Sequence, residues 1–447
     1  MKALSMFSNC GAGDVGYRRA GFEFKVMAEL NPNRLAVALA NHPTAVGVPG
    51  DLRTTWSTVV EKWRQAEGDR RPDLLAACPP CQGMSSARSG LGRHDDHEAG
   101  GKDPRNLLVT VIEEVARELK PRAIVVENVP AFLTRVVPHP LTGNAISAAL
   151  LLIEALSDDY EVFPLVGDLA DWGVPQTRKR SFLTLIRKDE ERLASHEGSV
   201  AFPQPTHADD WNGEQITIAD ALSSLGAKSL DALTPETAAD PSNPLHFVPV
   251  WGERQYRMVA AIPPNTGKGA WANEVCSSCD ALTEDLEAAI CAACGSPLLR
   301  PVVREGDSWR LVKGFRTSSY TRMKSAAPAS TVTTASGHVG SDKTIHPWEN
   351  RLLSPYECAY LQTLPDDFKW GDALERWGHS NVREMIGEAV PPRFTEMHGR
   401  AIRAFLEDLP EVHLLPASDS RATKARDLLE GARLKAHDGL RAVPTSV

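Results

Sequence analysis

ALSMFSNCGAGDVG, residues 3–16 of the chain, decides the fold. The stretch begins with a short apolar run, Ala3–Phe7, which is typical of a buried strand, and continues into a G-x-G-x-x-G pattern. Glycines let the backbone turn sharply and approach a nucleotide closely at the N-terminus of a helix. The stretch therefore predicts a strand, a binding loop and a helix for a nucleotide or another adenosyl group.

Short apolar runs alternate with helical patterns over the first ~190 residues, which is the signature of an α/β protein with a parallel sheet. The further predicted strands are Phe24–Ala28, Asp73–Ala77, Ala123–Glu127 and Ser181–Leu185. The clearest predicted helices are Leu107–Leu119 and Ala145–Leu156, where apolar residues recur at a spacing of three to four. We therefore expect a Rossmann-like domain with a mixed, mostly parallel sheet.

Two acidic residues follow the glycine loop at positions where a nucleotide would be bound. Glu29 ends the second predicted strand, where its carboxylate can accept hydrogen bonds from ribose hydroxyls. Asp51 lies where it can meet an adenine amino group, or where it simply caps the next helix. These features suit NAD as well as S-adenosylmethionine, so the loop alone does not name the cofactor.

Composition sets limits on the class of protein. The 447 residues are 42% hydrophobic and 24% charged, as in an ordinary globular protein. No apolar run approaches the ~20 residues of a membrane span, so we expect a cytoplasmic protein without a membrane partner. The net charge of −9 argues mildly against a nucleic-acid ligand, although basic runs occur at Arg178–Arg180 and Lys313–Lys324.

The run Cys78-Pro79-Pro80-Cys81 has three interpretations. It is a C-x-x-C pair, so it can be a redox dithiol or one half of a metal site. Alternatively, Cys81 alone is a nucleophile at the end of a strand, and Cys78 is a small buried residue. A redox pair favours a helix N-terminus, whereas a stretch rich in Gly and Ser follows here. The pattern favours Cys81 as the nucleophile.

Four further cysteines form two C-x-x-C pairs with eleven residues between them. Four thiolates at this spacing can surround Zn²⁺ tetrahedrally, and two disulfides are the alternative. The sequence around these cysteines offers no candidate catalytic His or acidic residue. We therefore expect a structural metal in a compact zinc ribbon. The predicted ligands are Cys276, Cys279, Cys291 and Cys294.

Periodicity weakens from about residue 189 to 344, where Pro and Gly become frequent, and helical patterning returns at Leu353–Leu361 and from Arg393 to Leu409. We therefore predict four segments: 1–188 and 345–410 as two parts of one catalytic domain, 189–344 as a smaller irregular domain with the ribbon at about 271–300, and 411–447 as a helical or partly disordered tail.

The ordered motifs resemble those of the cytosine-5 DNA methyltransferase family. The glycine loop is similar to the family's first motif, Pro80-Cys81-Gln82 to its Pro-Cys-Gln motif, and Glu127-Asn128-Val129 to its Glu-Asn-Val motif. Residues 176–180 (QTRKR) match Gln-x-Arg-x-Arg, and residues 351–366 and 387–392 (GEAVPP) resemble the ninth and tenth motifs. The irregular segment lies where the family places its target-recognition domain.

The resemblance implies a DNA (cytosine-5-)-methyltransferase that uses S-adenosylmethionine and forms a covalent adduct between Cys81 and C6 of a flipped cytosine. It assigns catalysis to Cys81, Glu127, Arg178 and Arg180. It places the cofactor against Phe7, Ser8, Gly11, Gly13, Glu29, Asp51, Leu52, Pro80, Glu388, Ala389 and Val390. It places the substrate against Gln82, Ser85, Asn128, Gln176 and Thr333. The expected partner is double-stranded DNA, bound by a monomer, with a cognate restriction or defence system.

Two positions depart from the family pattern. Asn9 stands where many members carry glycine, and Glu388 replaces the usual asparagine beside the cofactor. The Glu388 carboxylate is either a tolerated substitution or a change that alters the choice of methyl donor. Three alternative functions stay open: methylation of an RNA cytosine, a catalytically inactive DNA-binding module, and a NAD-dependent oxidoreductase that only the glycine loop supports.

Overall fold

A seven-stranded sheet organises the first part of the chain. The computed structural model describes every residue except 81–103, 212, 315–317, 342, 410–411 and 442–447. The strands run in the order β3-β2-β1-β4-β5-β9-β8. Neighbours from β3 to β5 are parallel, and β9 is antiparallel to both β5 and β8, so the predicted mixed, mostly parallel sheet is confirmed. The strands are β1 (Lys2–Met6), β2 (Glu23–Glu29), β3 (Val46–Pro49), β4 (Leu74–Ala77), β5 (Ala123–Asn128), β8 (Tyr160–Asp168) and β9 (Lys179–Arg187).

The strand order reverses beside β1. The chain adds β2 and β3 on one side of β1 and then crosses over to add β4 and β5 on the other side. In open α/β sheets, ligands bind in the crevice that such a reversal leaves outside the carboxyl ends of the strands. The topology therefore places a binding crevice where β1 and β4 end.

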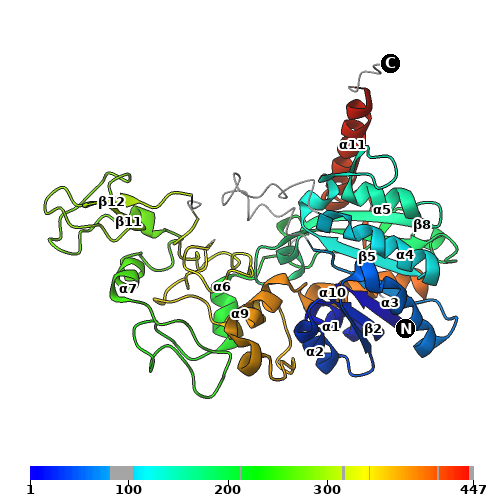
Figure 1. Cartoon of the computed structure of the whole chain (residues 1–447), viewed down its shortest axis with the longest axis horizontal. Helices are drawn as coiled ribbons and strands as arrows, with labels where there is room; N and C mark the ends of the chain where they lie inside the picture. Colours follow the sequence, from blue (N-terminus) through cyan, green and yellow to red (C-terminus); the bar gives the residue numbers. More distant parts are fainter. Residues whose placement is uncertain (81–103, 212, 315–317, 342, 410–411, 442–447) are drawn as a thin grey trace.

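Helices cover both faces of the sheet (Figure 1). One face packs against α3 (Leu52–Glu67), α4 (Val109–Leu119), α5 (Ala148–Leu156) and α11 (Ser420–Arg441). The other face packs against α1 (Ala12–Arg19), α2 (Pro32–Asn41) and α10 (Pro392–Leu406). The segment that was predicted as the start of a longer helix, Ala145–Ser147, is instead a strand, β7, which pairs with β6 (Val136–Pro138). The side chain of Ser147 then caps α5.

The contact between α1 and α10 brings the end of the chain back to its beginning. A methyl group on Gly16 would lie 2.0 Å from Thr395 Oγ1 and 2.2 Å from the Pro392 carbonyl oxygen. The glycine at position 16 is therefore required by the close approach of two helices that are almost 400 residues apart in the sequence. This approach positions the turn between α9 and α10 over the glycine loop.

The central region, residues 204–353, has little regular structure and lies to one side of the sheet (Figure 1). Its regular elements are α6 (Ile218–Leu225), α7 (Glu253–Ala260) and the hairpin of β11 (Val302–Glu305) and β12 (Ser308–Leu311). Two helices then return the chain to the sheet: α8 (Pro355–Leu361) and α9 (Ala373–Glu388), with a kink in α9 at Gly378. Upstream, β10 (Ser199–Pro203) pairs with β13 (Leu414–Pro416), so the chain stays beside the sheet as far as Pro203.

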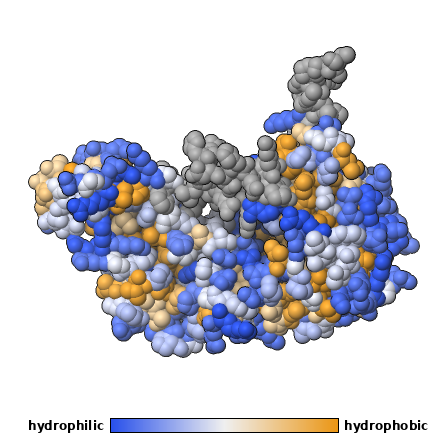
Figure 2. Space-filling model, in the orientation of Figure 1, coloured by the Kyte–Doolittle hydropathy of each residue, from blue (hydrophilic) through white to orange (hydrophobic). Residues whose placement is uncertain are grey.

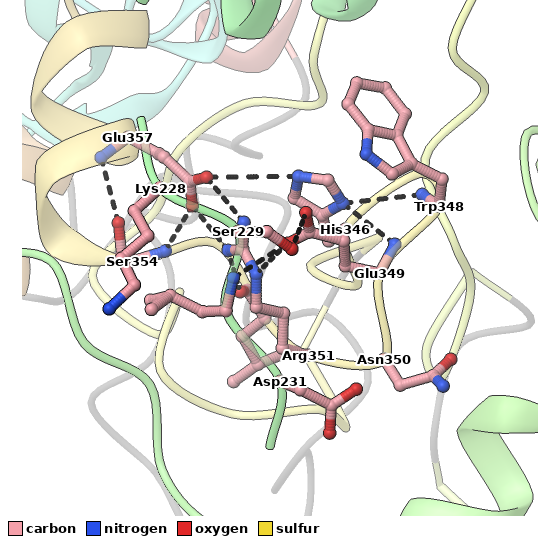
Figure 3. Close-up of polar contacts among 12 residues, drawn as sticks. Lys228, Ser229, Asp231, His346, Trp348, Glu349, Asn350, Arg351, Ser354 and Glu357 are labelled. Atoms are coloured by element: carbon pink, nitrogen blue, oxygen red, sulfur yellow. Dashed lines mark hydrogen bonds and ion pairs between the residues drawn. The ribbon is translucent and has the colours of Figure 1, made fainter. Parts of the chain in front are cut away.

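A buried polar network joins the central region to α8 (Figure 3). The guanidinium of Arg351 donates to both oxygens of Glu357 at 2.7 Å, and Ser354 and Glu357 form a capping box at the start of α8. Burial alone would raise the pKa of Glu357, but Arg351 and His346 hold it at about 2. The Ser354 hydroxyl also bonds Nδ1 of His246 from the central region, at 2.8 Å. The network fixes the end of the central region to the helix that follows it.

The molecular surface is mixed in character. Hydrophilic and hydrophobic residues are interspersed over both parts of the molecule in the view of Figure 2. Among the helices of the described chain, none has the length and apolar composition that crossing a membrane requires.

Candidate active site

Three loops meet at the carboxyl edge of the sheet. Met6, Ala77 and Val126 are paired across β1, β4 and β5, and these strands are parallel. The residues that follow the paired positions, Phe7, Cys78 and Glu127, therefore emerge side by side. Strand register alone thus brings together the glycine loop, the Pro-Pro-Cys segment and the Glu-Asn-Val segment.

A cavity opens at this edge. Its lining brings together the glycine loop, the ends of β4 and β5, and the turn after α9. The predicted cofactor residues in this lining are Phe7, Ser8, Gly13, Glu388, Ala389 and Val390. The other predicted cofactor residues lie outside this lining: Gly11, Glu29, Asp51, Leu52 and Pro80.

The glycine loop has an unusual backbone. Phe7 (φ 57), Asn9 (φ 49) and Gly11 (φ 73) are all left-handed, a region that asparagine tolerates better than most side chains. A methyl group on Gly13 would lie 3.1 Å from the Val390 Cβ atom, so only glycine leaves that contact relaxed. The departure at position 9 is therefore compatible with the turn, and its side chain gains a partner, because Asn9 Nδ2 donates to the Met385 carbonyl at 2.9 Å.

The carboxylate of Glu29 is held by the backbone. Its two oxygens accept from the main-chain N–H groups of Asn9 at 2.9 Å and Asn31 at 3.0 Å. Each carboxylate oxygen has two lone pairs, so each can accept a second hydrogen bond. Asp51 takes the role of a helix cap, since it accepts from the Arg53 N–H at 3.0 Å and forms an ion pair with that side chain. Asp51 therefore caps α3, and its contact with an adenine amino group stays a prediction.

Asp14 is a cavity residue that the sequence analysis did not single out. Its carboxyl group is buried under the loop and accepts from the Ser5 hydroxyl at 2.9 Å. Burial raises its pKa to about 7. An acidic residue two positions before the last glycine of the loop was the only signal for it in the sequence.

The end of β5 brings Glu127 into the lining of the cavity. Arg180 Nε lies 2.8 Å from Glu127 Oε1, and both side chains are largely buried. The side chain of Asn128 donates to the Pro79 carbonyl at 3.1 Å, which ties the end of β5 to the Pro-Pro-Cys segment. Burial, together with the charges of Glu127 and Asp14, raises the pKa of Cys78 well above its usual value, so Cys78 is held as an inert thiol. Cys81, Gln82 and Ser85 lie outside the described residues.

Arg178 is buried between the central region and the turn after α9. Its guanidinium is buried and donates to the carbonyls of Val332 (3.2 Å), Gly387 (3.0 Å) and Ala389 (2.8 Å). It therefore holds the central region and the turn after α9 together, and it does not line the cavity. The catalytic role of Arg178 stays a prediction.

Gln176 has a similar position. Its side-chain amide donates to the Leu361 carbonyl at 2.8 Å and accepts from the Val332 N–H at 3.0 Å. Thr333 follows, and its main chain packs directly on Gly387, where an added methyl group would lie 2.4 Å from the Thr333 carbonyl carbon. Gln176, Arg178 and the Val332–Thr333 segment thus form one joint between the sheet, the central region and α9.

The four cysteines of the predicted ribbon lie together. Their sulfur atoms are all within 4.8 Å of one another, with Cys276 and Cys294 at 3.6 Å and Cys279 and Cys291 at 3.7 Å. All four are free thiols, and these separations are far above the ~2.05 Å of a disulfide bond. Tetrahedral Zn–S bonds of ~2.3 Å place sulfurs about 3.8 Å apart. The two-disulfide alternative is therefore wrong, and the geometry is compatible with zinc.

The base of the ribbon is closed by hydrogen bonds. Arg300 is fully buried and donates from Nε to the Asn273 carbonyl at 2.8 Å, and from Nη1 and Nη2 to the carbonyls of Ala288 and Thr283. The Asn273 side chain in turn donates to the Leu299 carbonyl at 2.6 Å. The two chain ends that enter and leave the ribbon are therefore fixed to each other.

The comparison with family models decides what this arrangement belongs to. The model for C-5 cytosine-specific DNA methylase matches residues 1–404. The chain belongs to this family. It is therefore a DNA (cytosine-5-)-methyltransferase, and the family implies S-adenosylmethionine as the methyl donor.

Similar proteins agree with this membership. The chain is 26% identical to the type II methyltransferase M1.HgaI of Avibacterium volantium over 412 residues, which cover 89% of this chain and 97% of that protein. It is 27% identical to M.AgeI of Thalassovita gelatinovora, over 88% of this chain and 96% of the relative.

Solved structures show the same fold. A protein encoded within an E. coli prophage matches with a TM-score of 0.55 and 18% identity, over 91% of this methyltransferase and all of that chain. A DNMT2 variant of Spodoptera frugiperda matches with a TM-score of 0.52 and 14% identity, over 90% and 99%. The predicted Rossmann-like methyltransferase fold is therefore confirmed.

Proposed function

We propose that Cys81 is the nucleophile of this methyltransferase, that Glu127 binds the cytosine ring, and that Arg180 orients Glu127. The observation that supports these roles is the register of β1, β4 and β5, which brings the glycine loop, the segment before Cys81 and Glu127 to one cavity. Cys81 follows Cys78, which lines that cavity, by three residues in the sequence.

The cavity fits the methionine part of the donor. Asn9 lines it, and its Oδ1 atom is buried without a hydrogen-bond donor among the described residues. A buried acceptor of this kind favours a ligand that brings an N–H group. Beside it, Glu29 keeps acceptor capacity for ribose hydroxyls. S-adenosylmethionine, when bound, supplies an electrophilic methyl group on a sulfonium.

The chemistry needs a nucleophile because C5 of cytosine is itself a poor one. The Cys81 thiolate would bond to C6, and the electron pair displaced toward C5 would take the methyl group as the bond between that methyl and the donor's sulfur breaks, which leaves a neutral thioether. Glu127 binds N3 and the exocyclic amine while this charge develops. Loss of the C5 proton then lets the bond between Cys81 and C6 break, which returns the thiolate and releases 5-methylcytosine.

The remaining predicted residues divide into two groups. Arg178, Gln176 and Asn128 hold loops in place, because their side chains are committed to main-chain partners. Gln82, Ser85 and Thr333 are proposed to face the DNA. The target must leave the duplex for its C6 to reach the cysteine, so we propose base flipping into this cavity.

The wider setting is also a proposal. The four thiolates of the ribbon bind a structural Zn²⁺, because the sulfur separations match a tetrahedral site. We propose that residues 204–353 recognise the target sequence in double-stranded DNA. The relatives are type II methyltransferases, which supports a role as a monomeric modification enzyme beside a restriction or defence system.

A duplex that contains 5-fluorocytosine at target sites tests the nucleophile. Fluorine at C5 prevents the final proton loss, so methylated cytosine stays bonded to the attacking cysteine. We expect a denaturation-stable complex of protein and DNA with the wild type and with Cys78→Ser, and none with Cys81→Ser. Targets are first located by bisulfite sequencing of DNA from cells that express the protein. A complex that survives Cys81→Ser, or that disappears with Cys78→Ser alone, contradicts the assignment.

A further inference from the structure

The end of α9 is tied to α2 and to the glycine loop by three contacts. Arg34 of α2 forms an ion pair with Glu388, at 2.5 Å between Nη1 and Oε2, and a second with Glu384 at 3.2 Å. Asn9 of the glycine loop donates to the Met385 carbonyl at 2.9 Å. The two residues that depart from the family pattern, Asn9 and Glu388, therefore both connect to the same helix end.

Asn9 and Glu388 also share the cavity lining. The Oε2 atom of Glu388 accepts a hydrogen bond from Arg34, and its Oε1 atom has no hydrogen-bond donor among the described residues. The Asn9 acceptor is likewise buried without a donor in the described part of the chain. Asn9 and Glu388 therefore each bring to the cavity lining an oxygen atom that can accept a further hydrogen bond. This lining is where the methionine part of the donor is proposed to bind.

The charges around this wall are unequal. Glu29, Glu384 and Glu388 supply three carboxylates. Among the described residues, the cation that forms ion pairs with this group is Arg34, which pairs with Glu384 and Glu388. Burial alone would lower the pKa of Arg34, but Glu388 and Glu29 raise it, so the guanidinium stays charged. The excess of negative charge favours a cationic group in the cavity and disfavours a donor with an additional carboxylate.

We propose that two groups together bind the α-ammonium group of the methyl donor: the Glu388 carboxylate, which Arg34 positions, and the side-chain Oδ1 atom of Asn9. This inference rests on the proposed use of the cavity for S-adenosylmethionine and names the residues that recognise its amino end. It selects between the two interpretations of Glu388: the carboxylate is a binding group for the ordinary donor. Arg34 is a positioning residue, because it acts through Glu388.

The test compares S-adenosylmethionine with an analogue that lacks the α-amino group. Calorimetric titration of the wild type should show the analogue binding about 10- to 100-fold more weakly, the usual range for losing a charged hydrogen bond. Glu388→Gln should weaken S-adenosylmethionine and leave the analogue almost unchanged, so that the two ligands converge. In kinetics, the same variant should raise KM for the donor by a larger factor than it lowers kcat.

Two variants separate binding from packing. Glu384→Gln is the matched control, because Glu384 shares Arg34 but does not line the cavity, and it should keep the preference for the amino group. Exchanging the charges, with Arg34→Glu and Glu388→Arg together, restores an ion pair but places a cation at the wall. If Glu388 only held the helix in place, this double variant would regain wild-type affinity, which would overturn the proposal.

The wild-type comparison alone also decides, even where a variant fails to fold. Equal affinity for both donors overturns the inference and leaves the proposed function intact. Failure to bind either S-adenosylmethionine or its product at any concentration contradicts the proposed use of the cavity. Weaker binding of the analogue supports both.

Discussion

Replacing Gly387 with alanine should loosen the joint between the central region and the cavity. The added methyl group would lie 2.4 Å from both the Thr333 carbonyl carbon and the Thr334 nitrogen, whereas ordinary contacts begin at 3.4 Å. The obstacle is main chain, which cannot rotate away, so the two segments must separate by about 1 Å. Forced separations of this kind cost roughly 1–3 kcal/mol.

The damage should extend to the site. The Gly387 carbonyl also accepts from Arg178 at 3.0 Å, and the next residues carry Glu388 and Ala389 into the cavity. We therefore expect Gly387→Ala to lower both the urea midpoint of unfolding and the rate of DNA methylation.

Gly431→Ala is the control, because nothing lies within 4 Å of the added methyl group and the position is inside a helix. It should raise stability by about 0.5–1 kcal/mol, since alanine is the better helix former. An unfolding midpoint for Gly387→Ala equal to that of the wild type would refute the reasoning.

Three further predictions follow from buried groups. Arg178→Met should lower the free energy of unfolding by about 3 kcal/mol by removing its hydrogen bonds to three buried carbonyls; lost activity at unchanged stability would instead indicate a contact with the base. Cys279→Ser should lower the zinc content, measured by mass spectrometry, from about one ion per chain, together with Tm; wild-type protein without metal would contradict the ribbon. Burial lowers the pKa of His398 from 6.5 to about 3, so the unfolded chain binds a proton between these values that the folded chain excludes. Stability should therefore be full above pH 6.5 and fall as the pH drops, and His398→Gln should flatten the slope of the urea midpoint against pH; an unchanged slope would count against this.

Local patterns predicted the sheet only in part. The strands β1, β2, β4, β5 and β9 were predicted because each is a short apolar run next to a turn or a helix. The two edge strands β3 and β8 were not predicted: β3 has only four residues, and in β8 Pro164, which interior strands exclude, interrupts the apolar run. β9 is antiparallel to β5 because the chain first runs through the edge strand β8 and then turns back into β9. The residues of β9 alone do not indicate this path.

The site shows the same limit. Glycine spacing and strand ends predicted Phe7, Gly13 and Glu127 correctly as neighbours, because parallel strands end at a common edge. Burial decided Arg178, whose sequence context cannot distinguish a base contact from a bond to carbonyls. The pair of Arg34 and Glu388 spans 354 positions and was invisible in the sequence for that reason.

The closed base of the cysteine ribbon has a consequence for how such enzymes can change. Asn273 and Arg300 close the base of residues 274–299, and Arg254 and Arg257 of α7 donate to the Leu298 and Ser277 carbonyls of the same loop. Residues 274–299 can therefore be exchanged as a cassette where these main-chain contacts, and those of Arg300 to Thr283 and Ala288, are kept. Sequence changes within this cassette would alter the contacts that the enzyme makes outside its target site, and the residues of the methyl-transfer site would stay unchanged.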